Sequence, residues 1–234
     1  MIPKKILLML ADIEDAIGAE IGVAQGETTL QLVSLDNVKR VYAIDPFLKY
    51  SSPPNGIKSG QGYNDRKIAH MIDNEQTFED FYNICKNKFA AYKDRIILLR
   101  KFSNQAAKLI NEKLDFVYID GNHAYEYVYD DLEKYYKLVR PGGIIIGDDF
   151  SFTGGRIKHN NGGRISSKVD LACINFCKKK HIKFKVIEGN FVFIKPYASI
   201  QYENDYKFFS TENIKRILRN FKQFFLDTVD TIFK

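Results

Sequence analysis

Short apolar runs alternate along this chain with longer segments of helical spacing, and this alternation restricts the folds open to it. Five runs have the length and the near-continuous apolar character of strands covered on both faces of a sheet. Strands separated by helical segments pair in parallel, because each helix returns the chain to the edge where the previous strand began. We therefore predict an α/β fold with a mostly parallel sheet. The strand runs span residues 17–23, 41–45, 95–99, 115–120 and 143–148, and helical segments between them include 76–92 and 124–139.

The pattern changes near the end of the domain, where two short strand-like runs lie close together. Residues 184–187 and 191–194 are rich in apolar side chains, and they flank the tripeptide Glu-Gly-Asn at 188–190. Two such runs around a Gly-Asn turn predict a β-hairpin. The sheet is therefore expected to end in an antiparallel pair, and the domain is expected to span residues 1–196.

Residues 197–234 are predicted to form a C-terminal extension with one amphipathic helix. Across 211–233, apolar side chains fall on one helical face and basic side chains point elsewhere. Packing of this helix against its own domain or a partner subunit of a homo-oligomer is the favoured interpretation, and contact with a membrane surface is the alternative. The apolar positions are Ile214, Ile217, Leu218, Phe221, Phe224, Phe225, Val229 and Ile232.

Composition and charge exclude several broad classes of protein. Of the 234 residues, 45% are hydrophobic and 27% are charged, which is typical of a globular chain rather than a disordered one. No uncharged apolar run has the length needed to cross a bilayer. The three cysteines suggest neither a metal site nor a disulfide scaffold, and a cytoplasmic location is predicted. The net charge of +6 favours anionic partners without identifying them.

Two long segments, 49–66 and 151–166, interrupt the pattern of strands and helices. Both are rich in glycine and small polar residues, and both follow a predicted strand. Open α/β sheets bind ligands beyond the carboxyl ends of their strands, where long loops are often lids. Basic side chains in the second loop would suit an anionic substrate such as a nucleotide sugar, and a solvated surface loop is an equally supported interpretation. These side chains are Arg156, Lys158, His159 and Arg164.

A turn with two glycines leads from the first predicted strand into a helix. Gly22 and Gly26 allow the backbone to turn sharply and to approach a ligand closely, and the helix begins near Thr28. Asp45 stands at the end of the second predicted strand, where a carboxylate can accept both hydroxyls of a ribose. Together these features predict a nucleoside site in preference to a purely structural turn.

The spacing of the glycines argues against a dinucleotide ligand. The dinucleotide motif G-x-G-x-x-G needs a glycine where this chain has Ala24. The acidic Glu20 just before the turn would also be poorly placed beside a pyrophosphate. A ligand with a cationic amino-acid end suits this position better.

Acidic side chains follow the fourth and fifth predicted strands. Asp120 ends the fourth strand, and Asp148 and Asp149 end the fifth, so the three should meet at one edge of the sheet. Carboxylates packed together repel one another unless a cation lies among them, and oxygen ligands suit a hard cation such as Mg²⁺. A divalent-metal site is therefore predicted here. The alternative is that these aspartates cap a strand end or bind loop amides.

His123 lies three residues beyond Asp120, in the same predicted loop. Histidine has an ordinary pKa of about 6.5, so it can accept a proton at neutral pH. A lone histidine is more often structural than catalytic, but this one shares its loop with a candidate metal ligand. His123 is therefore a candidate general base.

The order of these motifs resembles that of the class I S-adenosylmethionine-dependent methyltransferases. The resemblance covers most of the chain, roughly residues 17–196. It implies a Rossmann-like three-layer sandwich whose seven-stranded, mostly parallel sheet ends in an antiparallel hairpin. The matching positions are Glu20, Gly22, Gly26, Asp45, Asp120 and the turn Pro141-Gly142-Gly143.

The same resemblance implies a binding site for S-adenosylmethionine. Glu20 and Gly22 would line its methionine end, and Asp45 would bind the ribose. Phe102 and Ser103 would lie near the adenine. The remaining candidate cofactor-binding positions are Gly26, Thr28 and Asp120.

Residues 117–150 resemble more narrowly the macrocin- and mycinamicin-type sugar O-methyltransferases, which depend on Mg²⁺. This resemblance implies that Asp120, Asp148 and Asp149 bind the metal and that His123 is the general base. A bound cation lowers the pKa of an acceptor hydroxyl while a base takes its proton. The implied acceptor is a small molecule such as a sugar or a nucleotide sugar.

Three hypotheses follow for the function of the chain. The leading one is a metal-assisted O-methyltransferase, and the second is a metal-independent methyltransferase of another acceptor class. The third is a non-catalytic nucleotide-binding protein with the same fold, since fold alone does not establish activity. Nucleic acid is disfavoured as a partner, because the chain has no Asn-Pro-Pro-Tyr-like motif and no clear basic stripe.

Overall fold

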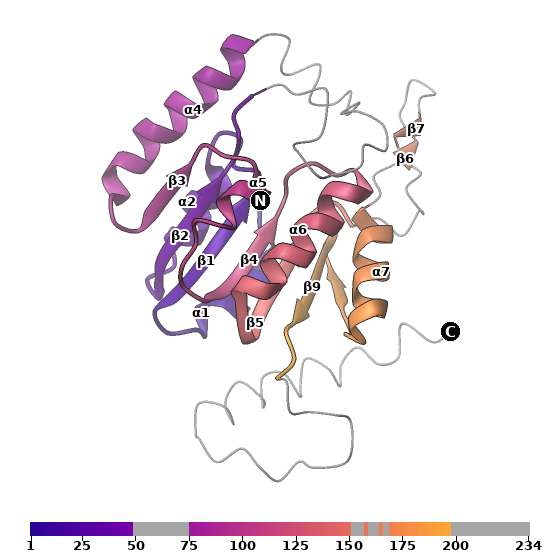
Figure 1. Cartoon of the computed structure of the whole chain (residues 1–234). Coiled ribbons are helices and arrows are strands. Elements are labelled where there is room, and N and C mark those ends of the chain that lie inside the picture. The colour runs from indigo at the N-terminus through magenta and orange to yellow at the C-terminus, as the bar shows by residue number, and fades with distance from the viewer. Residues whose placement is uncertain (49–74, 151–156, 159–163, 166–168, 198–234) are drawn as a thin grey trace. The chain divides into compact units, whose positions relative to one another are not determined.

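A seven-stranded sheet lies at the centre of the fold (Figure 1). Its first five strands along the chain pair in parallel, and its last two form an antiparallel hairpin at one edge. The predicted α/β fold and the predicted end of the sheet are therefore confirmed. In spatial order the strands are β3 (Ile96–Leu99), β2 (Val38–Ile44), β1 (Ala16–Ile21), β4 (Leu114–Ile119), β5 (Val139–Gly147), β9 (Asn190–Ile194) and β8 (Lys185–Ile187).

The structure, a computed structural model, describes residues 1–48, 75–150, 157–158, 164–165 and 169–197. Residues 1–197 belong to one compact unit. The predicted loop 49–66 and the predicted helix over 211–233 lie outside the described residues. The C-terminal extension 197–234 therefore stays a prediction.

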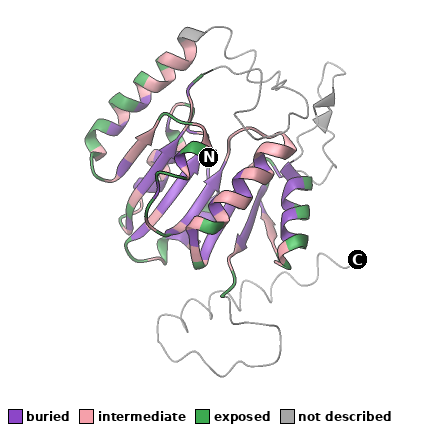
Figure 2. Cartoon of the chain, viewed as in Figure 1, coloured by how far each residue is buried: buried purple, intermediate pink, exposed green. Residues whose placement is uncertain are grey.

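Helices cover both faces of the sheet and bury its central strands. Alternate residues of a strand point to opposite faces, and every residue of β4 from Phe116 to Ile119 is buried (Figure 2). None of the described helices has the length and apolar character needed to span a membrane. The helices are α1 (Lys4–Ala11), α2 (Glu27–Val33), α4 (Glu75–Phe89), α5 (Ser103–Ala106), α6 (Tyr125–Leu138) and α7 (Val169–Lys180), with the 3₁₀ helix η1 (Ala90–Tyr92).

The residue that follows each central strand is fixed to its neighbouring strand by a backbone hydrogen bond. In each case the N–H of that residue donates to the carbonyl of the last residue of the adjacent strand. These bonds align the candidate site residues along the carboxyl edge of the sheet, where open α/β folds bind their ligands. The bonds run from Gly22 to Ile44 (2.9 Å), Asp45 to Leu99 (3.2 Å), Asp120 to Ile21 (2.8 Å) and Asp148 to Ile119 (3.0 Å).

Strand β5 begins earlier than the sequence predicts. The expected strand over 143–148 followed a Pro-Gly-Gly turn, but β5 already starts at Val139 and includes that tripeptide. Its first part is held by a backbone pair, in which the Gly142 N–H donates to the Lys195 carbonyl and the Lys195 N–H donates to the Gly143 carbonyl. Tertiary pairing thus makes a strand of residues whose local sequence favours a turn.

The terminal hairpin is present, but its turn lies one residue before the predicted Gly-Asn pair. The central turn residues are Glu188 and Gly189, with φ values of 49° and 85°. Positive φ at both central residues is typical of the two-residue turns that join twisted strands. Asn190 therefore belongs to β9, where it pairs with Ile187 of β8.

The predicted loop 151–166 contains a short antiparallel pair. Strand β6 (Ile157–Lys158) pairs with β7 (Arg164–Ile165). The prediction of a loop without strands was wrong at these four positions. The rest of this loop lies outside the described residues.

Candidate active site

The glycine turn after β1 packs directly on the end of β4. Gly22 has a φ of +90°, and a Cβ atom there would lie 2.1 Å from the backbone oxygen of Asp120. Gly26 has a φ of +86° and directly precedes α2, and a Cβ atom there would lie 2.7 Å from the Phe89 ring. Both positions therefore require glycine, for conformation and for space. We call residues 22–26 the glycine loop.

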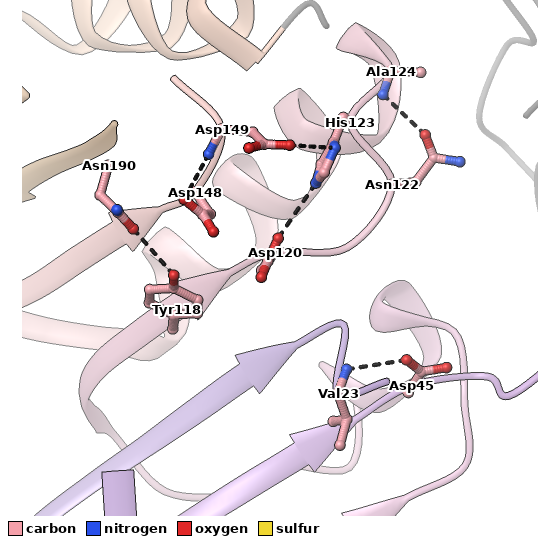
Figure 3. Close-up of polar contacts among 10 residues, drawn as sticks. All are labelled: Val23, Asp45, Tyr118, Asp120, Asn122, His123, Ala124, Asp148, Asp149 and Asn190. Carbon is pink, nitrogen blue, oxygen red and sulfur yellow. Dashed lines mark hydrogen bonds and ion pairs between the residues drawn. The ribbon is translucent and has the colours of Figure 1, made fainter. Parts of the chain in front are cut away.

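Asp45 holds the glycine loop through its carboxylate. Oδ2 accepts the backbone N–H group of Val23 (3.0 Å), as Figure 3 shows. Oδ2 also accepts the N–H of Ala24 (3.2 Å), and Oδ1 accepts that of Phe47 (2.7 Å). Burial raises the pKa of Asp45, and these three backbone donors act against that rise. A carboxylate has about four lone-pair positions, so one on Oδ1 is left for a further donor.

Glu20 lies beneath the glycine loop and is only 1% exposed. Its carboxyl group accepts a hydrogen bond from the hydroxyl of Thr29 in α2. Burial raises the pKa of Glu20 well above its ordinary value, and the charges of Asp120 and Asp45 add to this effect. Glu20 thus ties β1 to α2 and is covered by protein in this structure.

Thr29, which the sequence interpretation missed, makes this contact, whereas its neighbour Thr28 is half-buried. Helical spacing alone does not indicate which of two adjacent threonines points toward the strand. The assignment of Thr28 to the cofactor stays a prediction.

The loop after β3 carries the residues predicted for an adenine. Phe102 precedes the short helix α5, and Ser103 is its first residue. The next side chain, Asn104, has a buried Oδ1 with no hydrogen-bond partner among the described residues. A buried acceptor without a donor is costly. Arg40 Nε and Asp130 Oδ2 are buried without a partner among the described residues as well, so this property does not by itself mark a ligand contact.

His123 lies between two of the predicted metal ligands. Its Nε2 is 3.4 Å from Asp120 Oδ1, and its Nδ1 is 3.1 Å from Asp149 Oδ2 (Figure 3). The imidazole is partly buried, and Asp149 is exposed. The chain thus brings together His123, Asp120 and Asp149, as the sequence predicts.

The adjacent aspartates after β5 point in different directions. Asp149 has a φ of 56° and turns its carboxylate toward His123. Asp148 instead faces Asp120 and Tyr118, and its Oδ1 accepts the Asp149 N–H (2.8 Å). The left-handed backbone at Asp149 therefore directs the side chains of Asp148 and Asp149 to different partners, although the sequence analysis assigned both to one metal site.

We refer to Asp120, Asp148 and Asp149 as the acidic edge. Burial raises the pKa of Asp120, and the negative charges of Asp148 and Asp149 raise it further, while His123 lowers it. Within the described ranges, no three acidic, histidine or cysteine side chains are gathered closely enough to hold a metal ion. The donors are all carboxylate oxygens, which is the chemistry that a hard cation prefers.

Two further buried residues support the acidic edge, and the sequence interpretation missed both. Tyr118 is fully buried in β4, and its hydroxyl donates to Asn190 Oδ1 of β9 (3.1 Å) (Figure 3). The hydroxyl also faces Asp148, and burial raises the pKa of Tyr118 far above its ordinary value. Nothing in the sequence around Asn190, a polar residue next to the hairpin turn, indicates its contact with Tyr118.

Asn122, inside the Asp-Gly-Asn-His motif, has a local role. Its Oδ1 accepts the backbone N–H of Ala124 (2.9 Å), just before α6 begins. Side chains of this kind satisfy the free N–H groups at the start of a helix. Asn122 therefore helps to fix the loop that carries His123.

Asp131 of α6 is a buried carboxyl that should make stability depend on pH. Burial, together with the charge of Asp130, raises its pKa from 3.8 to about 7, although the neighbouring Ser103 and the charge of Lys134 oppose the rise. Below about pH 3.8 the group is neutral in both the folded and the unfolded chain, and this contribution to stability is complete. As pH rises through about 7, the contribution is lost.

We expect Asp131→Asn to flatten this dependence. Urea unfolding at several pH values from 4.5 to 7.5 measures it, and the wild-type free energy of unfolding should fall more steeply with pH than that of the variant. Parallel curves for the two proteins would contradict the assignment.

Comparison with known proteins places this site in context. Residues 19–150 match the family described as "Methyltransferase domain". This stretch is more than half of the chain, and it includes the glycine loop and the acidic edge.

A curated relative, the uncharacterized protein R132 of Acanthamoeba polyphaga mimivirus, is 32% identical over 75 residues. The matched part is 29% of this chain and 34% of that protein. The chain therefore spans about a third of the length of the curated relative it matches.

Several solved structures share the fold at low sequence identity. The O-methyltransferase NovP is 16% identical, with a TM-score of 0.55 over 78% of this chain and 72% of its own. An rRNA methylase from Streptococcus thermophilus is 12% identical, with a TM-score of 0.52 over 84% and 99%. An O-methyltransferase from Bacillus cereus in complex with SAH is 17% identical, with a TM-score of 0.50 over 82% and 78%. These likenesses show the fold.

Proposed function

This chain belongs to the methyltransferase domain family, and from that premise we propose that it is an S-adenosylmethionine-dependent O-methyltransferase. Its acceptor is a hydroxyl of a small molecule such as a sugar or a nucleotide sugar. The observation that carries the proposal is the row of Gly22, Asp45, Asp120 and Asp148 along the carboxyl edge of the sheet, with His123 beside the acidic edge. The narrower likeness to the Mg²⁺-dependent sugar enzymes is part of the proposal.

The residues at the nucleoside end fit this cofactor. The absence of a side chain at Gly22 lets the glycine loop pack directly on the backbone of Asp120, which brings the two predicted cofactor-binding segments together. Asp45 keeps one carboxylate position for a ribose hydroxyl. The candidate contacts for the adenine are Phe102, which directly precedes α5, and Ser103, the first residue of that helix.

Glu20 supports the methionine end indirectly. Because its carboxyl is covered and bonded to Thr29, its role in this structure is to position the glycine loop. The buried acidic group would also favour the cationic ammonium and sulfonium groups of the cofactor over an anionic ligand.

His123 is placed to accept the acceptor's proton. The shorter of its two contacts joins Nδ1 to Asp149, which favours a proton on Nδ1. Nε2, which faces Asp120, would then be the atom that accepts the acceptor's proton. S-adenosylmethionine supplies a methyl group on a positively charged sulfur. As the acceptor oxygen bonds to the methyl carbon, the carbon–sulfur bond breaks and the hydroxyl proton passes to Nε2. Orienting the two reactants supplies much of the remaining rate enhancement.

We include a divalent cation, with Mg²⁺ as the first candidate, in the proposal. Asp120, Asp148 and Asp149 are its candidate ligands, and because these described side chains are not gathered closely enough to hold an ion in this structure, they would have to approach one another on binding. Burial and, to a smaller extent, the charges of Asp148 and Asp149 raise the pKa of Asp120, and a bound cation would relieve the repulsion among them. Such an ion would lower the pKa of an acceptor hydroxyl. The contact of His123 with Asp120 and Asp149 is the observation that favours the metal-independent alternative, in which the carboxylates orient the base and the substrate.

Calorimetric titration with S-adenosylhomocysteine, the demethylated cofactor, tests the central proposal. We expect micromolar binding by the wild type and at least about tenfold weaker binding by Asp45→Ala, since the variant loses the hydrogen bond to the ribose and the bonds that hold the glycine loop. Titrations with Mg²⁺ and with EDTA test the metal separately.

Asp115→Ala is the matched control for this titration. Asp115 also accepts a strand backbone N–H, that of Ile17, but at the opposite end of the sheet. Its variant should bind the ligand as the wild type does. If well-folded wild-type protein does not bind S-adenosylhomocysteine, the proposal is wrong. The hypothesis of a non-catalytic protein that binds another ligand would then take its place.

A cytoplasmic location, a homo-oligomeric state and membrane contact through 211–233 remain predictions from the sequence. Gel filtration and vesicle sedimentation of the full chain test the last two.

A further inference from the structure

Ser103 is held at two points by side chains of α6. Its backbone carbonyl accepts the hydroxyl of Tyr135 (2.9 Å). Its side chain lies beside the carboxyl of Asp131 and acts to lower the pKa of that group. Asp131 and Tyr135 are four residues apart, so they lie on the same face of the helix. Tyr135 thus fixes the main chain of Ser103, and Asp131 offers an acceptor to its side chain.

Both holding side chains are deeply buried. Asp131 is 4% exposed and Tyr135 is 0% exposed, and Tyr135 belongs to the core cluster that α6 forms with the sheet. A buried hydroxyl or carboxyl is costly unless it is hydrogen-bonded. Apolar side chains at these two positions would therefore make the fold more stable. A function in placing Ser103 accounts for two polar groups here.

Helix α6 connects the two ends of the candidate site. It begins at Tyr125, directly after the loop that carries His123, and Asp131 lies eight residues beyond that base. At 1.5 Å per residue, Asp131 lies about 9 Å along the helix from its first residue, Tyr125. A rigid helix over this distance fixes the segment after β3 relative to the base.

We propose that Asp131 and Tyr135 form a clamp on Ser103 that sets the position of the adenine-binding segment 102–104 relative to His123. The clamp residues contact neither the cofactor nor the acceptor, so they are positioning residues. This inference rests on the proposed function, because it assigns segment 102–104 to the adenine of S-adenosylmethionine. Cofactor affinity then depends on hydrogen bonds made beneath the site.

Titration of the full chain with S-adenosylhomocysteine tests the clamp. Asp131→Ala and Tyr135→Phe should each weaken binding about threefold to tenfold, which is the effect of one lost hydrogen bond. Asp131→Asn should restore most of the affinity, because its amide oxygen can still accept the Ser103 hydroxyl. Because Asp131→Asn would also preserve the packing of α6, the comparison with Asp170→Ala is the one that excludes a merely structural role.

Asp170→Ala is the matched control. Asp170 is an equally buried aspartate in α7, 5% exposed, whose carboxylate accepts the Leu171 N–H. Its loss should lower thermal stability without changing the affinity for the ligand. Tyr135→Phe keeps the ring and its packing, so it maintains the test if Asp131→Ala does not fold.

The outcomes separate the clamp from the proposed function. If the wild type binds the ligand and Tyr135→Phe and Asp131→Ala bind it equally well, the clamp is wrong and the proposed function stands. Equal losses in Asp131→Ala, Asp131→Asn and Asp170→Ala would also overturn it, since they would reflect general destabilisation. No binding by the wild type would overturn the proposed function, and the clamp with it.

Discussion

Replacing His123 with alanine is expected to lower the rate of methyl transfer by about 10²–10⁴-fold, the usual contribution of a positioned general base. The affinity for S-adenosylhomocysteine should be unchanged, because the imidazole contacts Asp120 and Asp149 rather than the nucleoside end. The measurement is single-turnover formation of S-adenosylhomocysteine, with the acceptor that the wild type uses best in a panel of sugars and nucleotide sugars.

His181→Ala serves as the control for this experiment. His181 is exposed and follows the end of α7, and nothing in its position connects it to the acidic edge. Its variant should retain the wild-type rate. A His123→Ala enzyme that keeps more than a tenth of the wild-type rate at neutral pH would assign the proton transfer to another group or to water.

Replacing Gly22 with alanine is expected to destabilise the domain strongly and to abolish cofactor binding. The new methyl group would lie 2.1 Å from the Asp120 backbone oxygen, at a φ of +90°. Left-handed backbone strain and overpacking each cost about 1–3 kcal/mol, so the free energy of unfolding should fall by about 2–6 kcal/mol. Differential scanning calorimetry should show a melting temperature lower by at least about 5 °C.

Gly189→Ala distinguishes backbone strain from the steric clash. Gly189 has a φ of +85°, but a Cβ atom there would have nothing within 4 Å. This variant should lose only about 1–2 kcal/mol, the cost of left-handed backbone. If both variants lost the same small amount, the close approach of the glycine loop to β4 would be wrong.

The repeating pattern of strands and helices predicted most of the fold, because burial on both faces leaves a clear signal in each strand. All five parallel strands and the terminal hairpin are where the apolar runs lie, within a few residues. The errors lie where pairing overrides local preference. Val139 starts β5 two residues before a proline, because the main chain at Gly142 and Gly143 pairs with Lys195.

The candidate site was predictable in its residues but not in its contacts. The sequence allowed three site residues to be found because each directly follows a strand: Gly22, Asp45 and Asp120. His123 could be found because it lies three residues beyond Asp120. Tyr118 and Asn190 could not be found, since they meet only when β9 joins the sheet. Their sequence separation of 72 residues leaves no local pattern.

By itself, the sequence determined the class of fold, the edge of the sheet where the site lies and the residue types that reach it, because strand periodicity and loop position are local properties. Only the tertiary structure decided how these groups are used. It covered Glu20 with Thr29, engaged Asp45 with the glycine loop, and turned Asp149 toward His123 while Asp148 faced Tyr118. The direction of a side chain and the burial of its charge depend on neighbours that are distant in the chain, and folding alone brings those neighbours together.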